Sequence, residues 1–314
     1  MEKMKTRVGK MKRILDCTAS DFQKMDGKEL RQAIAAAEGR TVLAEVVCTV
    51  PPIYPSVTNA ELAAAFGADL ILLNVFDVDH PEVFGLETKG EETVRQLKKL
   101  VGRPVGINLE PVDPNAERLE ALYELPQGRR AVEASLVKAK QLGVDFVCLT
   151  GNPKTGVTNR AIVESVKTAK KIFGEEGLVI AGKMHGAGVK GESGGSIVDE
   201  ETVASFVDAG ADVVLIPGVG TVPGTTLEKQ EKLIQTIHEK GALALTAIGT
   251  SQEGAGKETV SQMALYNKMA GADIHHIGDA GIFGIADPEN IMAYSIAIRG
   301  RRHTYVRMAA SVLR

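Results

Sequence analysis

The sequence has no tryptophan, and aromatic residues of any kind make up only 4% of its 314 residues. Proteins that bind single-stranded nucleic acid stack the bases on aromatic side chains, so this scarcity argues against that class. The formal net charge is only −3. No field of one sign is therefore available to hold nucleic acid or an anionic membrane. We expect a small-molecule partner, no nucleic acid and no membrane.

Cysteines are few and long apolar runs are missing. Cys17, Cys48 and Cys148 show no Cys-x-x-Cys spacing, which predicts reduced thiols and a cytoplasmic location. No apolar run approaches the roughly 18 residues that cross a bilayer. The basic start lacks the apolar stretch of a signal peptide. We interpret residues 1–13 as a basic extension or disordered tail, and residues 14–314 as a single domain.

What the chain does contain is a repeated unit of a short apolar run followed by a helical pattern. Eight such runs are rich in Val, Ile, Leu and Ala. They are Thr41–Val50, Asp69–Phe76, Pro104–Val112, Asp145–Asn152, Leu178–His185, Asp212–Gly218, Leu243–Thr250 and Asp273–Gly278. Eight alternating strands and helices predict an α/β protein, a closed (βα)8 TIM barrel with its helices outside. The alternative, an open doubly wound sheet, lacks its Gly-x-Gly-x-x-Gly turn here.

Local signals mark the ends of the helices. Four of the runs follow a phrase of the type Gly67-Ala68-Asp69, in which the glycine ends the preceding helix in the left-handed conformation. The predicted helix N-caps are Thr58, Thr158, Asp199 and Thr226. An extra N-terminal helix, Gly27–Glu38, is expected to cap the barrel floor. Gly300 interrupts the last helix, and the nearby Arg299 and Arg307 are expected on a solvated or subunit-interface face of a homo-oligomer.

Polar residues occur within strands whose inward positions normally carry apolar side chains. Alternation predicts that Glu45, Asn108 and Glu110 face the barrel axis, with Lys183 and His185 opposite them. This requires Ile180, Gly182 and Met184 to face the helices. The other inward candidates are Asn74, Thr150, Asn152, Thr246, Thr250 and either His275 or His276, with His276 favoured. A purely structural ion pair of Lys183 is the alternative, but buried pairs add little stability because desolvation offsets their attraction.

Glycine-rich turns follow strands six, seven and eight. In many barrels the backbone N–H groups of these last loops bind phosphate. The residues predicted to bind substrate or phosphate are Asn74, Asn152, Gly218, Gly220, Gly249, Thr250, Gly278, Asp279, Ala280 and Gly281. Asp279 is the exception to the pattern, because a carboxylate repels a nearby phosphate.

Two further segments have open interpretations. The glycine-rich stretch 186–196 is either a mobile lid over the pocket or a surface loop. Asp77 and Asp79 follow strand two, and Asp77 with Glu110 or Glu45 is a candidate metal site. The spacing matches no strong metal signature. Mg²⁺ is therefore kept only as a candidate cofactor.

The predicted chemistry is proton transfer next to a carbonyl. His185 is a candidate acid or base, and Lys183 is a candidate for polarising a carbonyl or forming a Schiff base. Glu45 and Glu110 would orient the lysine or act as bases, and Asn108 completes the catalytic candidates. The leading hypothesis is a lyase or isomerase, such as an aldolase, epimerase or decarboxylase, acting on a small, phosphorylated, sugar-derived substrate.

Three segments carry a resemblance to a known family: Arg13–Phe22, Ala44–Val47 and Asn59–Asp69. From about Met11 onward the chain resembles an uncharacterised bacterial (βα)8-barrel family found beside sugar phosphotransferase genes. Its members are loosely labelled phosphoenolpyruvate phosphonomutase or haloacid-dehalogenase-like hydrolase. The dehalogenase's Asp-x-Asp-x-Thr motif is not found in the sequence. The glycines after strands six to eight are also similar to those of ribulose-phosphate-binding barrels.

This resemblance implies a sugar-linked context and leaves two alternatives to the leading hypothesis. One is a Mg²⁺-dependent phosphonomutase-like or lyase-like enzyme acting on a phosphoenolpyruvate-like acid. The other is a non-catalytic barrel that senses a sugar phosphate.

Overall fold

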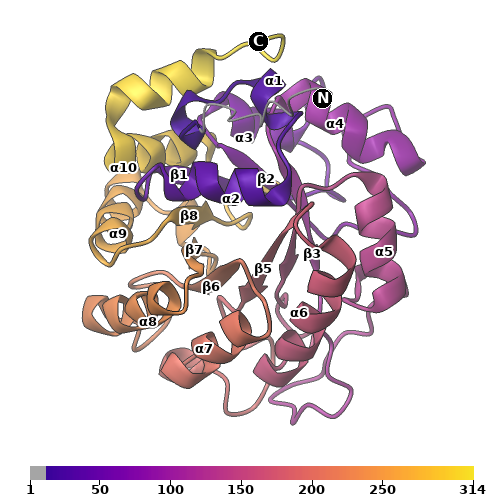
Figure 1. Ribbon diagram of the computed structural model, residues 1–314, viewed down its shortest axis with the longest axis vertical. Coiled ribbons are helices and arrows are strands. Elements are labelled where there is room, and N and C mark those ends of the chain that lie inside the picture. Colours follow the sequence, from indigo (N-terminus) through magenta and orange to yellow (C-terminus); the bar gives the residue numbers. More distant parts are fainter. Residues whose placement is uncertain (1–11) are drawn as a thin grey trace, which may run out of the picture.

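The computed structural model describes residues 12–314 as a closed barrel of eight parallel strands, each paired with its neighbours in sequence order (Figure 1). The predicted (βα)8 TIM barrel is thus confirmed. The strands are β1 (Thr41–Val47), β2 (Leu70–Asn74), β3 (Val105–Leu109), β4 (Phe146–Leu149), β5 (Leu178–Gly182), β6 (Val213–Pro217), β7 (Leu243–Ile248) and β8 (Ile274–Ile277). The basic extension predicted for residues 1–13 lies mostly outside the described residues.

Helices connect the strands and surround the barrel (Figure 1). They are α1 (Ala19–Phe22), α2 (Gly27–Ala35), α3 (Asn59–Ala65), α4 (Thr93–Val101), α5 (Glu133–Leu142), α6 (Asn159–Phe173), α7 (Glu200–Asp208), α8 (Leu227–Glu239), α9 (Lys257–Met269) and α10 (Pro288–Ala309). Short 3-10 helices occupy Ile14–Asp16, Gly90–Glu92, Gln127–Arg129, Gly194–Ser196 and Gln252–Gly254. All four predicted N-caps accept a backbone N–H through their side chains. Gly300 has a non-helical φ of 73° inside α10, as its predicted interruption requires.

The extra helix α2 covers the floor of the barrel, where the strands begin (Figure 1). Its buried side chains Leu30 and Ile34 pack with Leu43, Leu178 and other residues that fill the lower barrel interior. The backbone N–H of Gly27 donates to the carbonyl of Glu176, just before β5. The predicted capping role of this N-terminal helix is confirmed.

The aspartate of the repeated Gly-x-Asp phrase makes the same backbone contacts in every second βα unit. It immediately precedes each even-numbered strand and bonds the start of the preceding strand twice. The N–H of Asp69 donates to the carbonyl of Val42, while its Oδ2 accepts the N–H of Val42 at 2.8 Å. The same reciprocal pattern links Asp145 to Val105, Asp212 to Val179 and Asp273 to Ala244. The phrase therefore sets the register of strand pairs at the floor.

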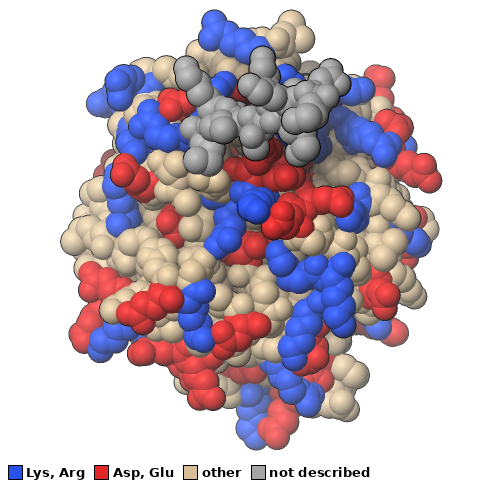
Figure 2. Space-filling view, viewed as in Figure 1, with Lys and Arg blue, Asp and Glu red and all other residues tan. Residues whose placement is uncertain are grey.

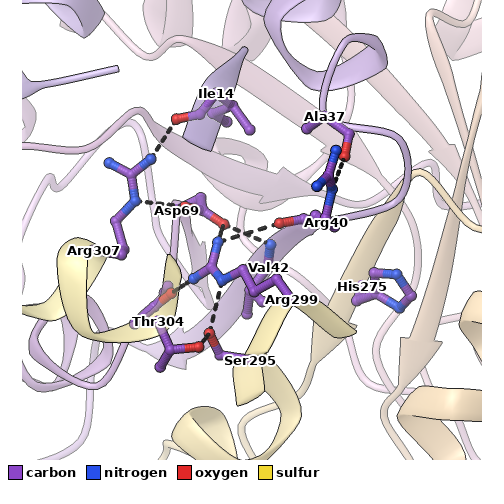
Figure 3. Close-up of polar contacts among 12 residues, drawn as sticks. Ile14, Ala37, Arg40, Val42, Asp69, His275, Ser295, Arg299, Thr304 and Arg307 are labelled. Atoms are coloured by element: carbon purple, nitrogen blue, oxygen red, sulfur yellow. Dashed lines mark hydrogen bonds and ion pairs between the residues drawn. The ribbon is translucent and has the colours of Figure 1, made fainter. Parts of the chain in front are cut away.

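Each of these aspartates also has a cationic partner. Three pair with a partly exposed side chain: Asp145 with Lys98, Asp212 with Lys170 and Asp273 with His238. Asp69 is different, because its side chain is 0% exposed and it pairs with two arginines (Figure 3). A buried ionic cluster thus lies at the start of β2.

The prediction that Arg299 and Arg307 lie on a solvated or subunit-interface face is wrong, because both belong to this buried cluster. The Arg299 guanidinium lies 2.5 Å from Asp69 Oδ2 and the Arg307 Nε lies 2.7 Å from Oδ1 (Figure 3). Arg307 also donates to the carbonyls of Ile14 and Cys17. Both arginines are buried, so they do not form a solvated face; they fasten α10 and the N-terminal segment to the floor.

On the face seen in Figure 2, positive and negative side chains are interspersed over the helices. Within residues 12–314, we find no helix of the length and apolarity that crossing a membrane requires.

Candidate active site

A cavity of about 500 Å³ opens at the carboxyl ends of the strands, opposite the floor. This is the end at which TIM-barrel enzymes place their active sites. Its lining includes Glu45, Asn74, Asn108, Glu120, Thr150, Asn152, Met184, His185, Gly249, Thr250, Ser251, Gly278, Asp279 and Ala280. Most of the residues predicted to contribute catalytic or substrate-binding groups therefore lie on the wall of one cavity.

Glu45 lies at the centre of the polar contacts. It points inward from β1, as predicted, and is 3% exposed. Its Oε2 lies 2.9 Å from Nε2 of His276 on the neighbouring strand β8, and its Oε1 accepts a hydrogen bond from the Asn108 amide. The favoured inward orientation of His276 is confirmed, whereas His275 faces outward and bonds Tyr294 and the carbonyl of Gly39. A carboxylate held by two donors keeps a fixed direction toward the cavity.

Three asparagines continue this network across the barrel mouth. The amides of Asn74 and Asn152 bond each other reciprocally at 2.9 Å, and Asn108 Nδ2 donates to Asn74 Oδ1 at 3.2 Å. Asn152 also donates to Glu110 through its Nδ2 and its backbone N–H, both at 3.1 Å. Arg129 completes the chain with an ion pair to Glu110 at 2.6 Å. Because it does not line the cavity, Glu110 is placed to position Asn152 rather than to act as a base.

Asp279 is the second carboxyl group of the cavity. Asn74 donates to its Oδ2 at 2.8 Å. Burial, and secondly the neighbouring charge of Glu45, raise the pKa of Asp279 to about 7. It therefore holds its proton up to neutral pH, where carboxyl groups are normally ionised. A carboxyl group that keeps its proton at this pH can serve as a general acid.

His185 lines the cavity on the opposite side, as predicted. Its Nδ1 accepts the N–H of Ala187 at 3.2 Å, so the neutral ring carries its proton on Nε2. Burial and the nearby Lys183 charge lower the pKa of His185 to about 4. At neutral pH it is an uncharged donor, suited to a hydrogen bond with substrate and not to the role of a cationic acid.

The prediction that Lys183 faces the barrel axis is wrong. Ile180 and Met184 belong to the apolar cluster inside the barrel. Lys183 directly precedes Met184 and alternates with it, so the lysine points outward, and it does not line the cavity. Its Nζ donates to Glu192 at 2.6 Å and to the carbonyl of Val157 at 2.9 Å. Burial lowers the pKa of this ammonium, and the Glu192 carboxylate opposes the shift. Schiff-base chemistry at Lys183 has no support from this geometry.

Thr246, between the inward Leu245 and Ala247, likewise faces outward and not into the cavity. Thr150 and Thr250 both line it.

Lys183 instead fastens the glycine-rich segment 186–196 to the barrel. Both carboxylate oxygens of Glu192 also accept the N–H of Asn159, at the start of α6. An isolated bridge between Arg118 and Val189 joins the segment to the loop that follows β3. The two loops together cover one side of the cavity. Movement of this cover as a lid remains a prediction.

We expect Lys183→Met to lower stability by about 2 kcal/mol, because a charged hydrogen-bond partner of Glu192 and of Val157 is lost. Catalysis should change little, since Nζ lies outside the cavity. Urea unfolding measures the first effect. The control is Lys138→Met, whose ion pair with Asp79 is about half exposed on the lysine side, and which should cost less than about 1 kcal/mol. If Lys183→Met keeps its stability but loses activity, Lys183 has a role in the active site and not the structural role assigned to it.

Only some of the residues in the predicted phosphate-binding loops line the cavity. Gly249, Thr250, Gly278, Asp279 and Ala280 line it. Gly218, Gly220 and Gly281 do not, and the N–H groups of Gly218 and Gly220 are used by backbone carbonyls within the protein.

A carboxylate of the chain itself occupies part of the predicted anion site. Glu253, which is 1% exposed, accepts the N–H of Ala280 at 3.0 Å. The N–H of Gly278 donates to the carbonyl of Ile248. These two donors are therefore not presented to a ligand. Sequence reasoning missed Glu253 because it lies in a short 3-10 helix beyond β7, outside any strand pattern.

The residues predicted to hold a metal form no ligand cluster. Asp77 Oδ1 accepts the N–H of Asp79 and its Oδ2 lies 3.7 Å from His80, whereas Glu110 bonds Arg129 and Asn152. Throughout residues 12–314, no three side chains of His, Cys, Asp or Glu are grouped so as to hold a metal ion.

Comparison with known sequences shows the family. Residues 15–314 match the model of a family described as "Domain of unknown function (DUF7916)", and the chain belongs to this family. A curated relative, geranylgeranylglyceryl phosphate synthase of Ignicoccus hospitalis, is 32% identical over 112 residues, which cover 36% of this chain and 39% of that protein. The matched part thus spans about two fifths of the relative's length.

Solved structures show the same fold at low identity. The carboxyl transferase domain of Rhizobium etli pyruvate carboxylase, solved with pyruvate, superposes with a TM-score of 0.53 at 12% identity, covering 95% of this chain and 52% of that one. Thiamine phosphate pyrophosphorylase from Pyrococcus furiosus matches at 12% identity with a TM-score of 0.47, covering 84% and 97%. The carboxyl transferase match concerns the barrel architecture alone.

Proposed function

We propose that this protein is an enzyme of lyase or isomerase type that moves a proton next to the carbonyl of a small, sugar-derived molecule. The observation that carries the proposal is the pair of carboxyl groups at the cavity, Glu45 and Asp279. The first is held by His276 and Asn108, and the second has its pKa raised to about 7. Such a pair supplies a base and an acid at the same pH.

Each group has a distinct task in this reaction. The Glu45 carboxylate takes a proton from the carbon beside the carbonyl, and the C–H electrons move into the new C=C bond. Asp279 gives its proton to the carbonyl oxygen, which yields a neutral enediol. Glu45 then gives its proton to the former carbonyl carbon, and the Asp279 carboxylate takes the proton of the other enediol hydroxyl, whose oxygen becomes the carbonyl of the isomer. His276 and Asn108 hold Glu45 in place, while Asn74 holds Asp279.

A phosphorylated substrate is the second form of this proposal. It is favoured by the position of Gly249, Thr250 and Gly278 on the cavity wall, at the strand ends where barrels hold phosphate. The curated relative described above also carries a phosphate compound in its name. Against it stands the carboxylate of Glu253, which accepts the N–H of Ala280 at the same strand ends. The unphosphorylated form is therefore our first choice.

Hydrogen exchange with solvent tests the proposal directly. The protein is incubated in D2O with dihydroxyacetone, D-ribose and D-glucose and with the phosphate ester of each, and the compounds are analysed by mass spectrometry. Enzyme-dependent gain of one deuterium on carbon supports proton abstraction beside the carbonyl. Exchange of the esters alone would select the phosphorylated form. No exchange in any of the six compounds, with binding retained, would favour a non-catalytic sensor.

The raised pKa of Asp279 predicts a pH effect on stability. Its folded pKa of about 7 lies above the ordinary 3.8, so the folded protein binds this proton more tightly than the unfolded chain does. Stability contributed by the proton is lost as pH rises across this interval. Asp279→Asn removes the dependence, so the variant should gain stability relative to wild type as the pH rises from about 4 to about 8.

Unfolding temperatures measured across this interval test the effect. In Asp199→Asn, which replaces a carboxyl whose pKa is lowered by hydrogen bonds to Thr202, no such gain is expected. A constant difference between Asp279→Asn and wild type would show that the Asp279 pKa is not raised.

A further inference from the structure

Two residues that line the cavity each have a buried polar atom without a hydrogen-bond partner in the protein. The atoms are Oδ1 of Asn108, just beyond the middle of β3, and Oγ1 of Thr150, directly after β4. Asn108 is 4% exposed and Thr150 is 2% exposed. A buried polar atom without a partner costs about 1–3 kcal/mol in proteins, so such atoms are uncommon and informative.

Strand register brings the two residues to one face. Asn108 pairs with Cys148, and both Cys148 and Thr150 project to the interior because they lie two positions apart. Asn108 and Thr150 are thus diagonal neighbours on the inner wall of the barrel, and both line the cavity.

The orientation of the Asn108 amide is determined by its surroundings. Its Nδ2 donates to Glu45 Oε1 and to Asn74 Oδ1. Exchanging nitrogen and oxygen would place Oδ1 against two acceptors, one of them a carboxylate, which is unfavourable. The free atom is therefore an acceptor, and the ligand group that meets it has to donate a hydrogen.

Thr150 can bond a ligand group of either kind. Its hydroxyl has a hydrogen to donate as well as lone pairs to accept with. A hydroxyl group placed between the two side chains donates to Asn108 Oδ1 and accepts from Thr150. An ammonium group donates to both oxygens but leaves the Thr150 hydrogen without an acceptor, and a phosphate oxygen leaves Asn108 Oδ1 without a donor.

We propose that Asn108 and Thr150 form a subsite for a hydroxyl group of the substrate, next to the carbon that Glu45 deprotonates. The substrate is then a hydroxylated carbonyl compound of the sugar class. This inference deepens the proposed function and rests on it for the position of the reacting carbon. The charge of the site agrees, because none of the described residues that line the cavity is Lys or Arg, and His185 is uncharged at neutral pH.

Binding of matched probe pairs tests the subsite separately from turnover. Dissociation constants are measured by ligand-observed NMR for dihydroxyacetone against hydroxyacetone, D-ribose against 2-deoxy-D-ribose, and D-glucose against 2-deoxy-D-glucose. 2-Amino-2-deoxy-D-glucose probes an ammonium group in the same place. We expect one pair at least to show about tenfold tighter binding of the hydroxylated member.

Variants connect this preference to the two residues. Thr150→Val removes the hydroxyl at nearly constant volume and should abolish the preference without lowering the unfolding temperature. Thr150→Ser should retain it. Thr41→Val is the matched control, because the Thr41 hydroxyl is also buried and unpartnered in the protein but lies at the floor, at the start of β1.

Each outcome has a separate meaning. A preference that survives in Thr150→Val, a preference absent from all three pairs, or tightest binding of the amino sugar would overturn the hydroxyl subsite. A preference lost in Thr150→Val and kept in Thr41→Val would establish it. If that result is accompanied by no deuterium exchange, the subsite stands and the proposed proton transfer fails.

Discussion

Replacing Asp69 by asparagine should lower the free energy of unfolding by about 3–5 kcal/mol, the cost of breaking a buried ion pair from one side. The amide oxygen of the substituted side chain would still accept the N–H of Val42, so the β1–β2 register would be retained. The charge of Arg299 and Arg307 would be left buried without its counter-ion (Figure 3). Arg103 lies nearby, its pKa lowered to about 10 by burial and by Arg307, and adds to the repulsion.

The repeat in the chain supplies a matched control. Asp212 makes the same reciprocal contact with Val179, but its partner Lys170 is 28% exposed. Asp212→Asn should therefore cost only about 1 kcal/mol, as partly exposed pairs do. Urea unfolding of both variants, followed by circular dichroism, measures the difference. Equal losses would mean that the floor cluster contributes no more than the repeat contact. If Asp69→Asn does not fold at all, Asp69→Glu tests whether restoring the charge restores the fold.

Glu45→Gln is expected to reduce deuterium exchange by about 10²- to 10⁴-fold, the usual contribution of a general base. Glutamine has nearly the same shape and can still accept a hydrogen bond from His276, so the cavity should keep its form. The loss should appear in the rate at saturating substrate and only weakly in binding, because the amide cannot take a proton from carbon.

Glu120→Gln is the control for loss of a negative charge at the cavity. Glu120 lines the same cavity and pairs with Lys154 at 3.3 Å near the surface. Glu120→Gln should leave exchange within about threefold of wild type, as expected of a surface substitution away from the chemistry. Equal losses in the two variants would indicate a general electrostatic effect of the cavity. Unchanged exchange in Glu45→Gln would remove Glu45 as the base.

The architecture follows from local features of the chain. Eight apolar runs separated by helical patterns, four threonine or aspartate N-caps and the repeated Gly-x-Asp phrase each have a local physical cause, and the structure has all of them where the sequence places them. Inward-facing Glu45 and Asn108 were also predictable, because a charged or amide side chain amid branched apolar residues is rarely placed under the helices.

Strand β5 shows where local features are insufficient. Both faces of a parallel barrel strand are buried, so its residues are apolar on either side and alternation alone does not distinguish inside from outside. Pairing with β4 settles the question, since Ile180 pairs with the inward Cys148. Lys183 then lies outside, where Glu192 from a later loop neutralises it.

Local features of the chain are sufficient to predict a (βα)8 barrel with carboxylates and amides at the carboxyl ends of its strands, because capping, alternation and repetition act over a few residues. Which of these groups meet depends on the tertiary structure. It joined Glu45 to His276, raised the pKa of Asp279, placed Glu253 at the predicted anion site and left Asn108 and Thr150 facing the cavity. Those properties depend on burial and on neighbours more than 20 residues away in the chain, and only closure of the barrel brings these neighbours together.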